Sequence, residues 1–367
     1  MRINHFCRLQ SLLIIKEFRV RDWSTGEAVL CEAKYEAIAE VRKARRREFS
    51  CFCVAKCSPF GEQKKTREVS AANDERPNEE EKEMTQKERR LYLISELLKE
   101  DKGRAGFNLG LVPGNEGGFV IPDDEKSQRD ILRALMNIRG PYSISEDFLG
   151  IQDEYLQQVN KERGITDIAD LSPVREAGGF DRLNHRGQLY LWQGDITTLK
   201  VDAIVNAANS ALLGCFAPLH ICIDNCIHTF AGIQLRLACN ELMQKQGHEE
   251  GTGLCKITPA FNLPSRYVLH TVGPIITTVV SAREKIQLAS CYKNCLETAA
   301  ENQLESIAFC CISTGVFRFP AELAAQIAVE TVEKWLSENP ESRVKKVIFN
   351  VFGNKDLEIY KKVLGQK

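Results

Sequence analysis

From Gly187 to the end of the chain, short apolar runs alternate with longer segments whose apolar residues recur at helical spacing. The strand-like runs are Leu189–Gln193, Ala203–Asn206, Tyr267–Val272, Ile307–Ile312 and Val344–Val351. The helical segments are Ile223–Lys245, Arg283–Asn302, Pro320–Ser337 and Asp356–Leu364. Strands that alternate with helices form a sheet with helices on both faces. The pattern therefore predicts an α/β domain over residues 187–367, with ligands bound beyond the carboxyl ends of the strands.

Residues 84–171 carry helical signals without strands. Leu91, Ile94 and Leu97 recur at helical spacing, and Ser143 followed by Glu146 matches a capping box. No catalytic cluster is visible in this stretch of the sequence. We therefore predict a small helical accessory region over residues 84–171, joined to the α/β domain by a linker over residues 172–186.

Residues 1–83 differ in character from the rest of the chain. A basic run from Arg42 to Arg47 and an acidic stretch from Asp74 to Glu83 both lack a sustained apolar period, so low order is expected. Because Met84 directly precedes a helix start, this extension could also lie upstream of the native start of translation. The segment holds three closely spaced cysteines that match no familiar zinc pattern, Cys51, Cys53 and Cys57.

The overall charge and the cysteine usage narrow the choice of partners and compartment. The 367-residue chain has a formal net charge of -1, so no whole-chain field favours nucleic acid or an anionic membrane. No apolar run is long enough to span a bilayer. We therefore expect neither nucleic acid nor a membrane as a partner. The chain has 14 cysteines without a recognisable secretory signal, which predicts reduced thiols or metal ligands and a cytoplasmic setting.

Polar or glycine-containing turns follow the predicted strands, where a ligand of such a sheet would bind. Glycine lets the backbone approach a ligand closely and turn its N–H groups toward phosphate oxygens. Taken singly, each turn is weak evidence, because glycine ends strands in many proteins. In chain order the turns are Gly194-Asp195-Ile196-Thr197, Asn206-Ala207-Ala208-Asn209-Ser210, Gly251-Thr252-Gly253, His270-Thr271-Val272-Gly273-Pro274 and Ser313-Thr314-Gly315-Val316-Phe317.

The order of these turns, with the strand residues that precede them, resembles the macrodomain family from about Gly187 to Leu364. The resemblance implies a macrodomain-like three-layer α/β/α fold with a mixed central sheet, and a cleft for ADP-ribose. In that cleft Asp195 would accept the adenine amino group, supported by the Ile196 backbone, and Asn209 would face the distal ribose. The loop around the diphosphate and distal ribose would consist of Ser313, Thr314, Gly315, Val316 and Phe317.

Phe352 follows the last predicted strand, and its role has two interpretations. By the same resemblance its ring could stack on adenine, and as a large apolar residue it could equally pack in the core.

The segment after Gly214 departs from most macrodomains, many of which have a run of glycines there. Here Cys215, His220 and Cys222 lie close together in a loop that enters a helix. Two thiolates and an imidazole form a donor set suited to Zn²⁺, and three protein ligands leave a fourth position for water or substrate. The segment resembles the zinc-containing branch of macrodomains, which predicts a catalytic zinc site. The alternative is that these cysteines and the histidine are unrelated core and surface residues.

Polar residues beside this loop are candidates for catalysis. Asp224 could orient or deprotonate the attacking water, or it could complete the metal shell, and the sequence does not decide between these roles. Asn209 would position the ribose, and Asn225 could assist. His228 lies one helical turn after Asp224 on the same face and is expected to hydrogen-bond and position the loop. Cys226 lies one helical turn after Cys222 and could face the site, but it is expected to be a core residue.

These residues favour one functional class over two others. The first is a zinc-dependent hydrolase that removes mono-ADP-ribose from modified protein side chains, with ADP-ribosylated protein and ADP-ribose as partners. The second is a non-catalytic module that binds ADP-ribose. The third is a nucleic-acid-associated protein that works through the basic run. The predicted metal ligands and Asp224 favour the hydrolase, because recognition alone needs no metal.

Overall fold

The computed structural model describes residues 83–114, 118–177 and 183–365. The predictions for residues 1–82, including the basic run and the three closely spaced cysteines, lie outside the described residues. None of the helices in the described residues has the length and apolarity of a membrane span.

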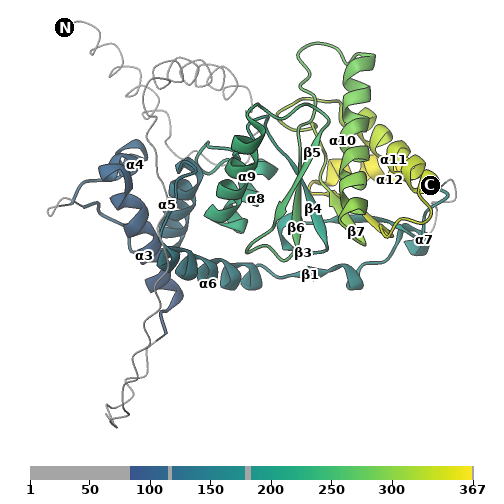
Figure 1. The fold of residues 1–367 in the computed structure, drawn as a ribbon. Helices are drawn as coiled ribbons and strands as arrows, with labels where there is room; N and C mark the ends of the chain where they lie inside the picture. Colours follow the sequence, from purple (N-terminus) through teal and green to yellow (C-terminus); the bar gives the residue numbers. More distant parts are fainter. Residues whose placement is uncertain (1–82, 115–117, 178–182, 366–367) are drawn as a thin grey trace, which may run out of the picture. The chain divides into compact units, whose positions relative to one another are not determined.

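A sheet of six parallel and antiparallel strands forms the centre of the described region (Figure 1). The strands are β2 (Leu189–Gln193), β4 (Ala203–Ala207), β5 (Cys255–Pro259), β6 (Tyr267–Thr271), β7 (Ser306–Phe309) and β8 (Lys346–Val351). Their order across the sheet is β2-β8-β7-β4-β6-β5, and only the β5–β6 pair is antiparallel among them. The prediction of a mixed sheet is confirmed. The edge strand β5 was not predicted, because Lys256, Thr258 and Pro259 interrupt its apolar pattern.

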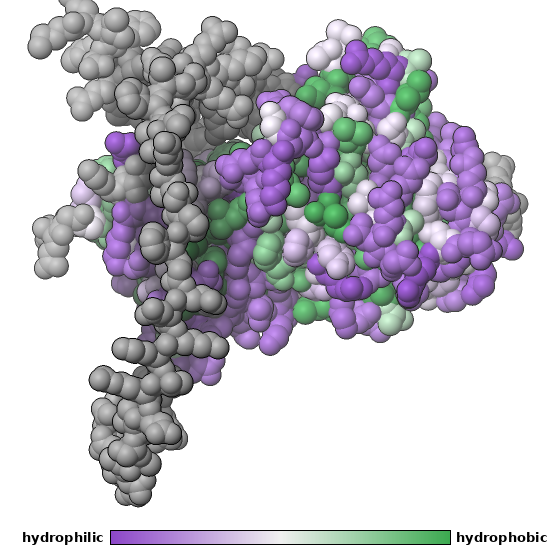
Figure 2. Space-filling model, viewed as in Figure 1, coloured by the Kyte–Doolittle hydropathy of each residue, from purple (hydrophilic) through white to green (hydrophobic). Residues whose placement is uncertain are grey.

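Helices lie on both sides of this sheet, as the alternating pattern predicted (Figure 1). On one side are α8 (Ile223–Ala231) and α9 (Ile233–Gln246), and on the other are α10 (Ala282–Glu301), α11 (Ala321–Glu338) and α12 (Asn354–Leu364). In the central strands, the side chains of Ile204, Val205 and Phe349 are fully buried in the core between the sheet and its helices. The exposed face seen in Figure 2 is mostly hydrophilic and carries only small apolar patches.

The segment Ile223–Lys245 was predicted as one helix and is two. Gly232 separates α8 from α9 with a φ of 95°, which a residue with a side chain rarely adopts. A Cβ at this position would also lie 2.7 Å from the Gln152 amide nitrogen. The periodicity of apolar residues continues through the break, so the pattern alone could not reveal it.

The helical region consists of α3 (Gln86–Lys99), the turn η1 (Glu100–Gly103), α4 (Arg104–Asn108), α5 (Glu125–Ile138) and α6 (Glu146–Glu162). Its apolar core includes Leu93, Ile94, Leu135 and Phe148, and this core also takes in Ile233 from α9. The helical region therefore packs directly on the α8–α9 layer of the α/β fold.

The chain between the helical region and the sheet contains short elements. Strand β1 (Thr166–Asp167) pairs with β3 (Leu199–Lys200) in a separate two-stranded sheet, and η2 (Ile168–Asp170) follows β1. The predicted linker contains α7 (Val174–Ala177), and η3 (Ile196–Thr198) comes directly after β2.

Candidate active site

The loops singled out in the sequence meet at one edge of the sheet. Strands β2, β8, β7, β4 and β6 are parallel, so their carboxyl ends point the same way. The turn at Asp195 follows β2, the loop from Asn209 to Cys222 follows β4, and the Ser313–Phe317 loop follows β7. Ligands of α/β sheets bind at this edge, beyond the carboxyl ends of the strands.

The carboxylate of Asp195 is held by its own turn and by the helical region. Its Oδ1 accepts hydrogen bonds from the backbone N–H and the hydroxyl of Thr197, at 2.9 and 2.7 Å. Its Oδ2 forms an ion pair with Arg163, which follows α6, and this guanidinium also stacks on the ring of Phe230. The Asp195 side chain remains 36% exposed, so it can still reach a ligand.

The loop expected to wrap the diphosphate has an unusual backbone. Ser313 has a φ of 64°, and its buried hydroxyl has no hydrogen-bond partner among the residues that the structure describes. A Cβ on Gly273 would lie 1.9 Å from that hydroxyl oxygen, so only glycine fits beside it. Nothing lies within 4 Å of the position that a Cβ would take at Gly315. The N–H of Ile276 donates to the carbonyl of Phe317 and ties this loop to the one after β6.

The interpretation of Phe352 as a core residue is wrong. Its side chain is 78% exposed just past the end of β8. An exposed ring at this edge of the sheet is available for stacking on a flat ligand.

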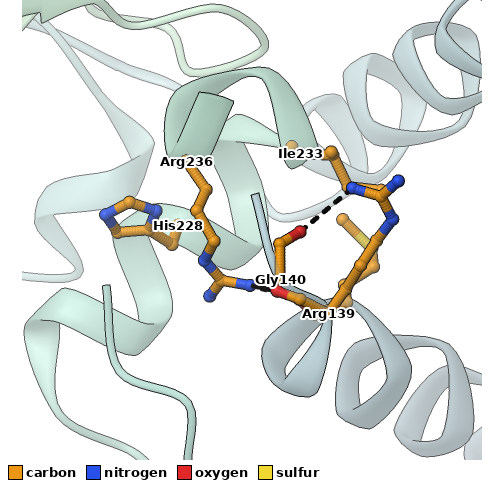
Figure 3. A pocket seen from close by; sticks show the side chains of 7 residues that line it. Arg139, Gly140, His228, Ile233 and Arg236 are labelled. Atoms are coloured by element: carbon orange, nitrogen blue, oxygen red, sulfur yellow. Dashed lines mark hydrogen bonds between the residues drawn. The ribbon is translucent and has the colours of Figure 1, made fainter. Parts of the chain in front are cut away.

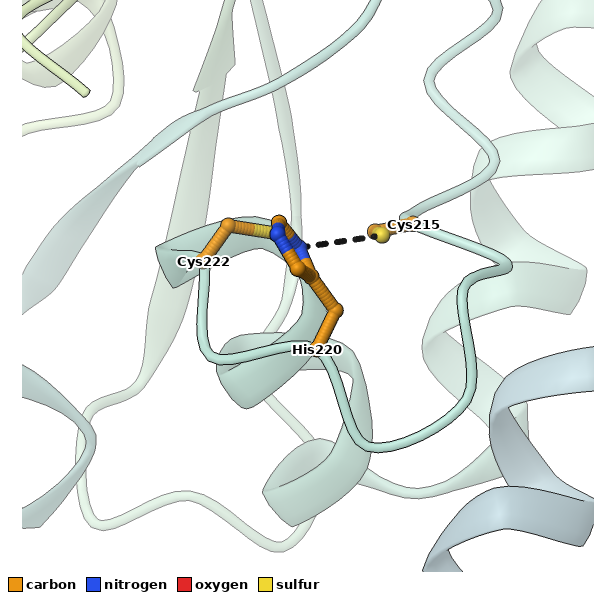
Figure 4. A group of neighbouring side chains, drawn as sticks. All are labelled: Cys215, His220 and Cys222. Carbon is orange, nitrogen blue, oxygen red and sulfur yellow. Dashed lines mark hydrogen bonds between the residues drawn. The ribbon is translucent and has the colours of Figure 1, made fainter. Parts of the chain in front are cut away.

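The three predicted metal ligands converge (Figure 4). The ligand atoms of Cys215, His220 and Cys222 all lie within 4.8 Å of one another. The sulfur of Cys215 is 3.6 Å from Nδ1 of His220. Zinc bonds of about 2.3 Å to sulfur and about 2.0 Å to nitrogen, at a tetrahedral angle, place these two atoms about 3.5 Å apart. The donor set and its spacing therefore fit zinc.

The two thiols of this group shift each other's pKa in opposite directions. The hydrogen bond from Cys222 lowers the pKa of the Cys215 thiol, and His220 acts in the same direction. The pKa of Cys222 is raised by its pairing with Cys215 and by burial. Cys222 is also the N-cap of α8, and its sulfur accepts a hydrogen bond from the backbone of Asn225.

Asp224 lies in the first turn of α8 and is 6% exposed. Its Oδ1 accepts a hydrogen bond of 2.8 Å from the amide of Asn206, and its Oδ2 accepts one of 3.2 Å from the amide of Asn209. Burial raises the pKa of Asp224 to about 7, and the charge of Cys215 adds to this, against the two amides and Arg236. The structure thus places a carboxylate with two fixed donors beside the metal ligands.

The two candidate amides have different surroundings. Asn209 donates to the Gly214 carbonyl as well as to Asp224, so its side chain links the start of the metal loop to the carboxylate. Asn225 is fully buried, and its amide nitrogen donates to the carbonyls of Cys215 and Ala217. The structure therefore places Asn225 beneath the metal loop, where its side chain supports the backbone of that loop.

His228 positions the loop by packing, and the predicted hydrogen bond is not present. Neither of its ring nitrogens has a hydrogen-bond partner in the described part of the chain, and its Nε2 is 3.7 Å from Oδ1 of Asp224. Burial lowers the pKa of His228 well below its usual range, so the ring is neutral. The ring lies under Gly214, where a Cβ would come within 2.7 Å of it.

Cys226 is not a fully buried core residue as expected. It is partly exposed, and its sulfur lies 3.7 Å from Nη2 of Arg133 in α5.

A second group of potential metal ligands consists of His228, Cys239 and His270, all buried. Both ring nitrogens of His270 already have partners, because Nδ1 faces the amide of Asn206 at 3.2 Å and Nε2 faces the Thr258 hydroxyl at 2.9 Å. This group is best described as a polar core that holds Asn206 in place for its hydrogen bond to Asp224.

A small cavity of about 10 Å³ adjoins His228 (Figure 3). That volume holds about one water molecule, so the cavity cannot be a nucleotide site. Arg236 lines it and donates to the backbone carbonyls of Met136 and Arg139 at the end of α5.

Comparison with known proteins identifies the family. The Macro domain model matches residues 205–328. A Protein-ADP-ribose hydrolase from Treponema medium is 56% identical over 282 residues, which cover 77% of this chain and 100% of the relative. This chain belongs to the macrodomain family. It groups there with the protein-ADP-ribose hydrolases and is an enzyme of the hydrolase class.

A second relative and a solved structure are also similar to this chain. A Protein-ADP-ribose hydrolase from Staphylococcus aureus (strain MSSA476) is 43% identical over 275 residues, which cover 74% of this chain and 98% of the relative. Among solved structures, an Oceanobacillus iheyensis macrodomain mutant with ADPR is 40% identical with a TM-score of 0.44. That alignment covers 48% of this chain and 91% of the other.

Several residues of this macrodomain site were not found by sequence reasoning. Arg133 and Arg163 belong to the helical region, and Arg236 lies on α9. Each is distant in the sequence from the loop that it contacts. The role of Asn206 was also missed, although the sequence carries a signal for it. An asparagine near the end of an otherwise apolar strand indicates a buried hydrogen bond.

Proposed function

We propose that this chain is a zinc-dependent hydrolase that removes mono-ADP-ribose from modified protein side chains. One observation carries the proposal: the ligand atoms of Cys215, His220 and Cys222 converge within 4.8 Å, and the buried carboxylate of Asp224 lies two positions further along the chain. A module that only recognises ADP-ribose has no use for such a donor set. The names of the macrodomain relatives support the same class of reaction.

The binding cleft in this proposal uses the loops at the carboxyl edge of the sheet. Asp195 and the Ile196 backbone hold the adenine, and the exposed ring of Phe352 stacks on it. The Ser313–Phe317 loop wraps the diphosphate with its backbone N–H groups. Asn209 holds the distal ribose, which brings the reacting carbon toward Asp224.

The reaction breaks the bond between C1 of the distal ribose and the acceptor atom of the protein. Water supplies the new oxygen on C1, the acceptor side chain leaves with a proton, and the products are ADP-ribose and unmodified protein. Cys215, His220 and Cys222 would hold the zinc ion, which would supply Lewis-acid chemistry for activating water or polarising a ribose oxygen.

Asp224 orients the attacking water and accepts its proton. Both of its oxygens already accept hydrogen bonds from Asn206 and Asn209, which fixes the direction of the carboxylate. Each oxygen keeps a further acceptor position, and we assign that position to the attacking water, with metal ligation as the alternative. The reduced thiols that this chemistry needs favour the cytoplasm as its setting.

The test is an assay of the full chain on a mono-ADP-ribosylated protein. We expect release of free ADP-ribose, loss of that release after treatment with EDTA, and recovery when zinc is added back. Tight binding of ADP-ribose without release would identify a binding module. Turnover that survives complete removal of the metal would refute zinc dependence while leaving the hydrolase class in place.

A further inference from the structure

Helix α5 of the helical region reaches the metal loop through Arg133. The Nη2 group of Arg133 donates to the backbone carbonyl of His220 at 2.8 Å and to the side-chain oxygen of Asn225 at 2.9 Å. Arg133 and His220 are 87 residues apart in the sequence. One guanidinium thus fixes both a metal ligand's backbone and the asparagine that supports the loop from below.

Asn137 makes a second contact one helical turn later. Its side-chain oxygen accepts a hydrogen bond of 3.0 Å from the backbone N–H of Leu219, and its amide donates to the hydroxyl of Thr229 in α8. Asn137 is 1% exposed. Leu219 has a φ of 59°, a left-handed conformation that costs energy for a residue with a side chain. The Asn137 contact therefore holds the strained residue that directly precedes the ligand His220.

The start of the loop is tied to the same helix through Arg236. Its Nε donates to the carbonyl of Leu213 at 2.7 Å, and its Nη1 donates to the carbonyls of Met136 and Arg139 at the end of α5. Figure 3 shows this guanidinium between α9 and the end of α5. The chain on both sides of the metal ligands is thus anchored to α5.

The part of the loop on either side of His220 has little apolar packing to hold it. Leu219 and Ile221, which flank His220, are 37% and 69% exposed, so apolar packing does not fix this part of the loop. A metal site needs its ligands held to within about 0.5 Å, and partners behind the ligands usually provide that. The contacts from α5 are such partners.

We propose that the helical region is a built-in positioning element for the metal loop, in which Arg133 and Asn137 hold the backbone at Leu219 and His220 so that the three ligands are preorganised for zinc. This inference rests on the proposed function, because it presupposes that the loop binds zinc. Arg133 and Asn137 are positioning residues and do not touch the metal or the substrate.

The charge of Arg133 gives the test a distinctive sign. At a pH where the thiols and the imidazole are already deprotonated, a cation near a zinc site repels the ion, so removing the charge alone would strengthen metal binding. Loss of positioning would weaken it. A weaker site in a variant that has lost the positive charge therefore points to geometry as the cause.

The experiment measures zinc affinity and the rate of zinc transfer to a chromogenic chelator, in the full chain and in Arg133→Met. The matched control is Arg129→Met, which removes another arginine from the same helix. Arg129 pairs with Glu125 and Glu162 and does not contact the loop. We expect Arg133→Met to bind zinc about 10–100-fold more weakly. We expect Arg129→Met to match the wild type, and ADP-ribose affinity to stay unchanged in both variants.

A second variant guards against loss of folding. Asn137→Ala should release zinc faster and regain the wild-type turnover rate when zinc is in excess. If wild-type protein binds zinc and both Arg133→Met and Asn137→Ala hold it as tightly, the positioning role is refuted. If wild-type protein itself fails to bind zinc, the proposed function fails instead.

Discussion

Gly214 and Gly247 make a matched pair for testing how the metal loop is built. Both have a φ of 77°, so alanine at either position is forced into the left-handed region. Gly247 ends α9, and nothing lies within 4 Å of the position its Cβ would take. At Gly214 a Cβ would lie 2.7 Å from Cγ and 2.8 Å from Cδ2 of the His228 ring.

The expected magnitudes follow from these distances. The left-handed conformation costs about 1–2 kcal/mol for a residue with a side chain, so Gly247→Ala should lower the free energy of unfolding by about that amount. Gly214→Ala adds an overpacking cost of about 1–3 kcal/mol, because its Cβ would overlap the buried His228 ring. Since Cys215 follows Gly214 directly, the displaced backbone should also weaken zinc binding in this variant alone.

Urea unfolding and zinc titration of both variants provide the measurement. The free energies of unfolding should differ clearly between the two variants, and only Gly214→Ala should bind zinc more weakly than the wild type. Adding His228→Ala to Gly214→Ala should restore part of the stability difference, because it removes the clash. If the two glycine variants were equally stable within about 0.5 kcal/mol, with the same zinc affinity, the packing argument would be refuted.

Three further predictions concern separate parts of the molecule. Cys222→Ala should abolish zinc binding and turnover, whereas Cys226→Ala, which changes a nearby thiol outside the ligand group, should keep both in metal analysis and the hydrolysis assay. Asp195→Ala should weaken ADP-ribose binding by about tenfold or more in calorimetry, since a charged hydrogen bond is lost; unchanged affinity would mean that the adenine lies elsewhere. Burial tends to raise the pKa of Asp202, but hydrogen bonds from backbone N–H groups and an arginine outweigh it and lower the pKa. The carboxylate therefore contributes stability above about pH 4, and this stability is lost as the pH falls through its lowered pKa. Asp202→Asn should lower the free energy of unfolding by about 1–3 kcal/mol at pH 7 and should be as stable as the wild type in acid. A difference in stability that is the same at every pH would contradict this.

Much of the fold could be predicted from local patterns. Leu189–Gln193 was found with its observed bounds, because the apolar run from Leu189 to Trp192 lies between two glutamines with a glycine beyond each of them. The break at Gly232 was missed because the apolar periodicity continues through it, and the edge strand β5 was missed because polar residues and a proline interrupt its apolar pattern.

The candidate site divides in the same way. Cys215, His220 and Cys222 are close in sequence, so their convergence follows from one short loop. The ion pair between Arg163 and Asp195 and the contacts of Arg133 join residues that are far apart in the sequence. Nothing in the local sequence of α5 or α6 distinguishes these arginines from solvent-exposed ones, so only the packing of the helical region reveals their role.

The central claim is that the loop after Gly214 holds a metal ion, and its most direct test is the number of zinc ions bound per chain. Mass spectrometry of the intact protein under native conditions, after incubation with zinc and removal of the excess, measures this number. The full chain is expected to hold one more zinc ion than the Cys215→Ala and Cys222→Ala variants. Equal metal content in the wild type and both variants, together with undiminished release of ADP-ribose, would contradict the account.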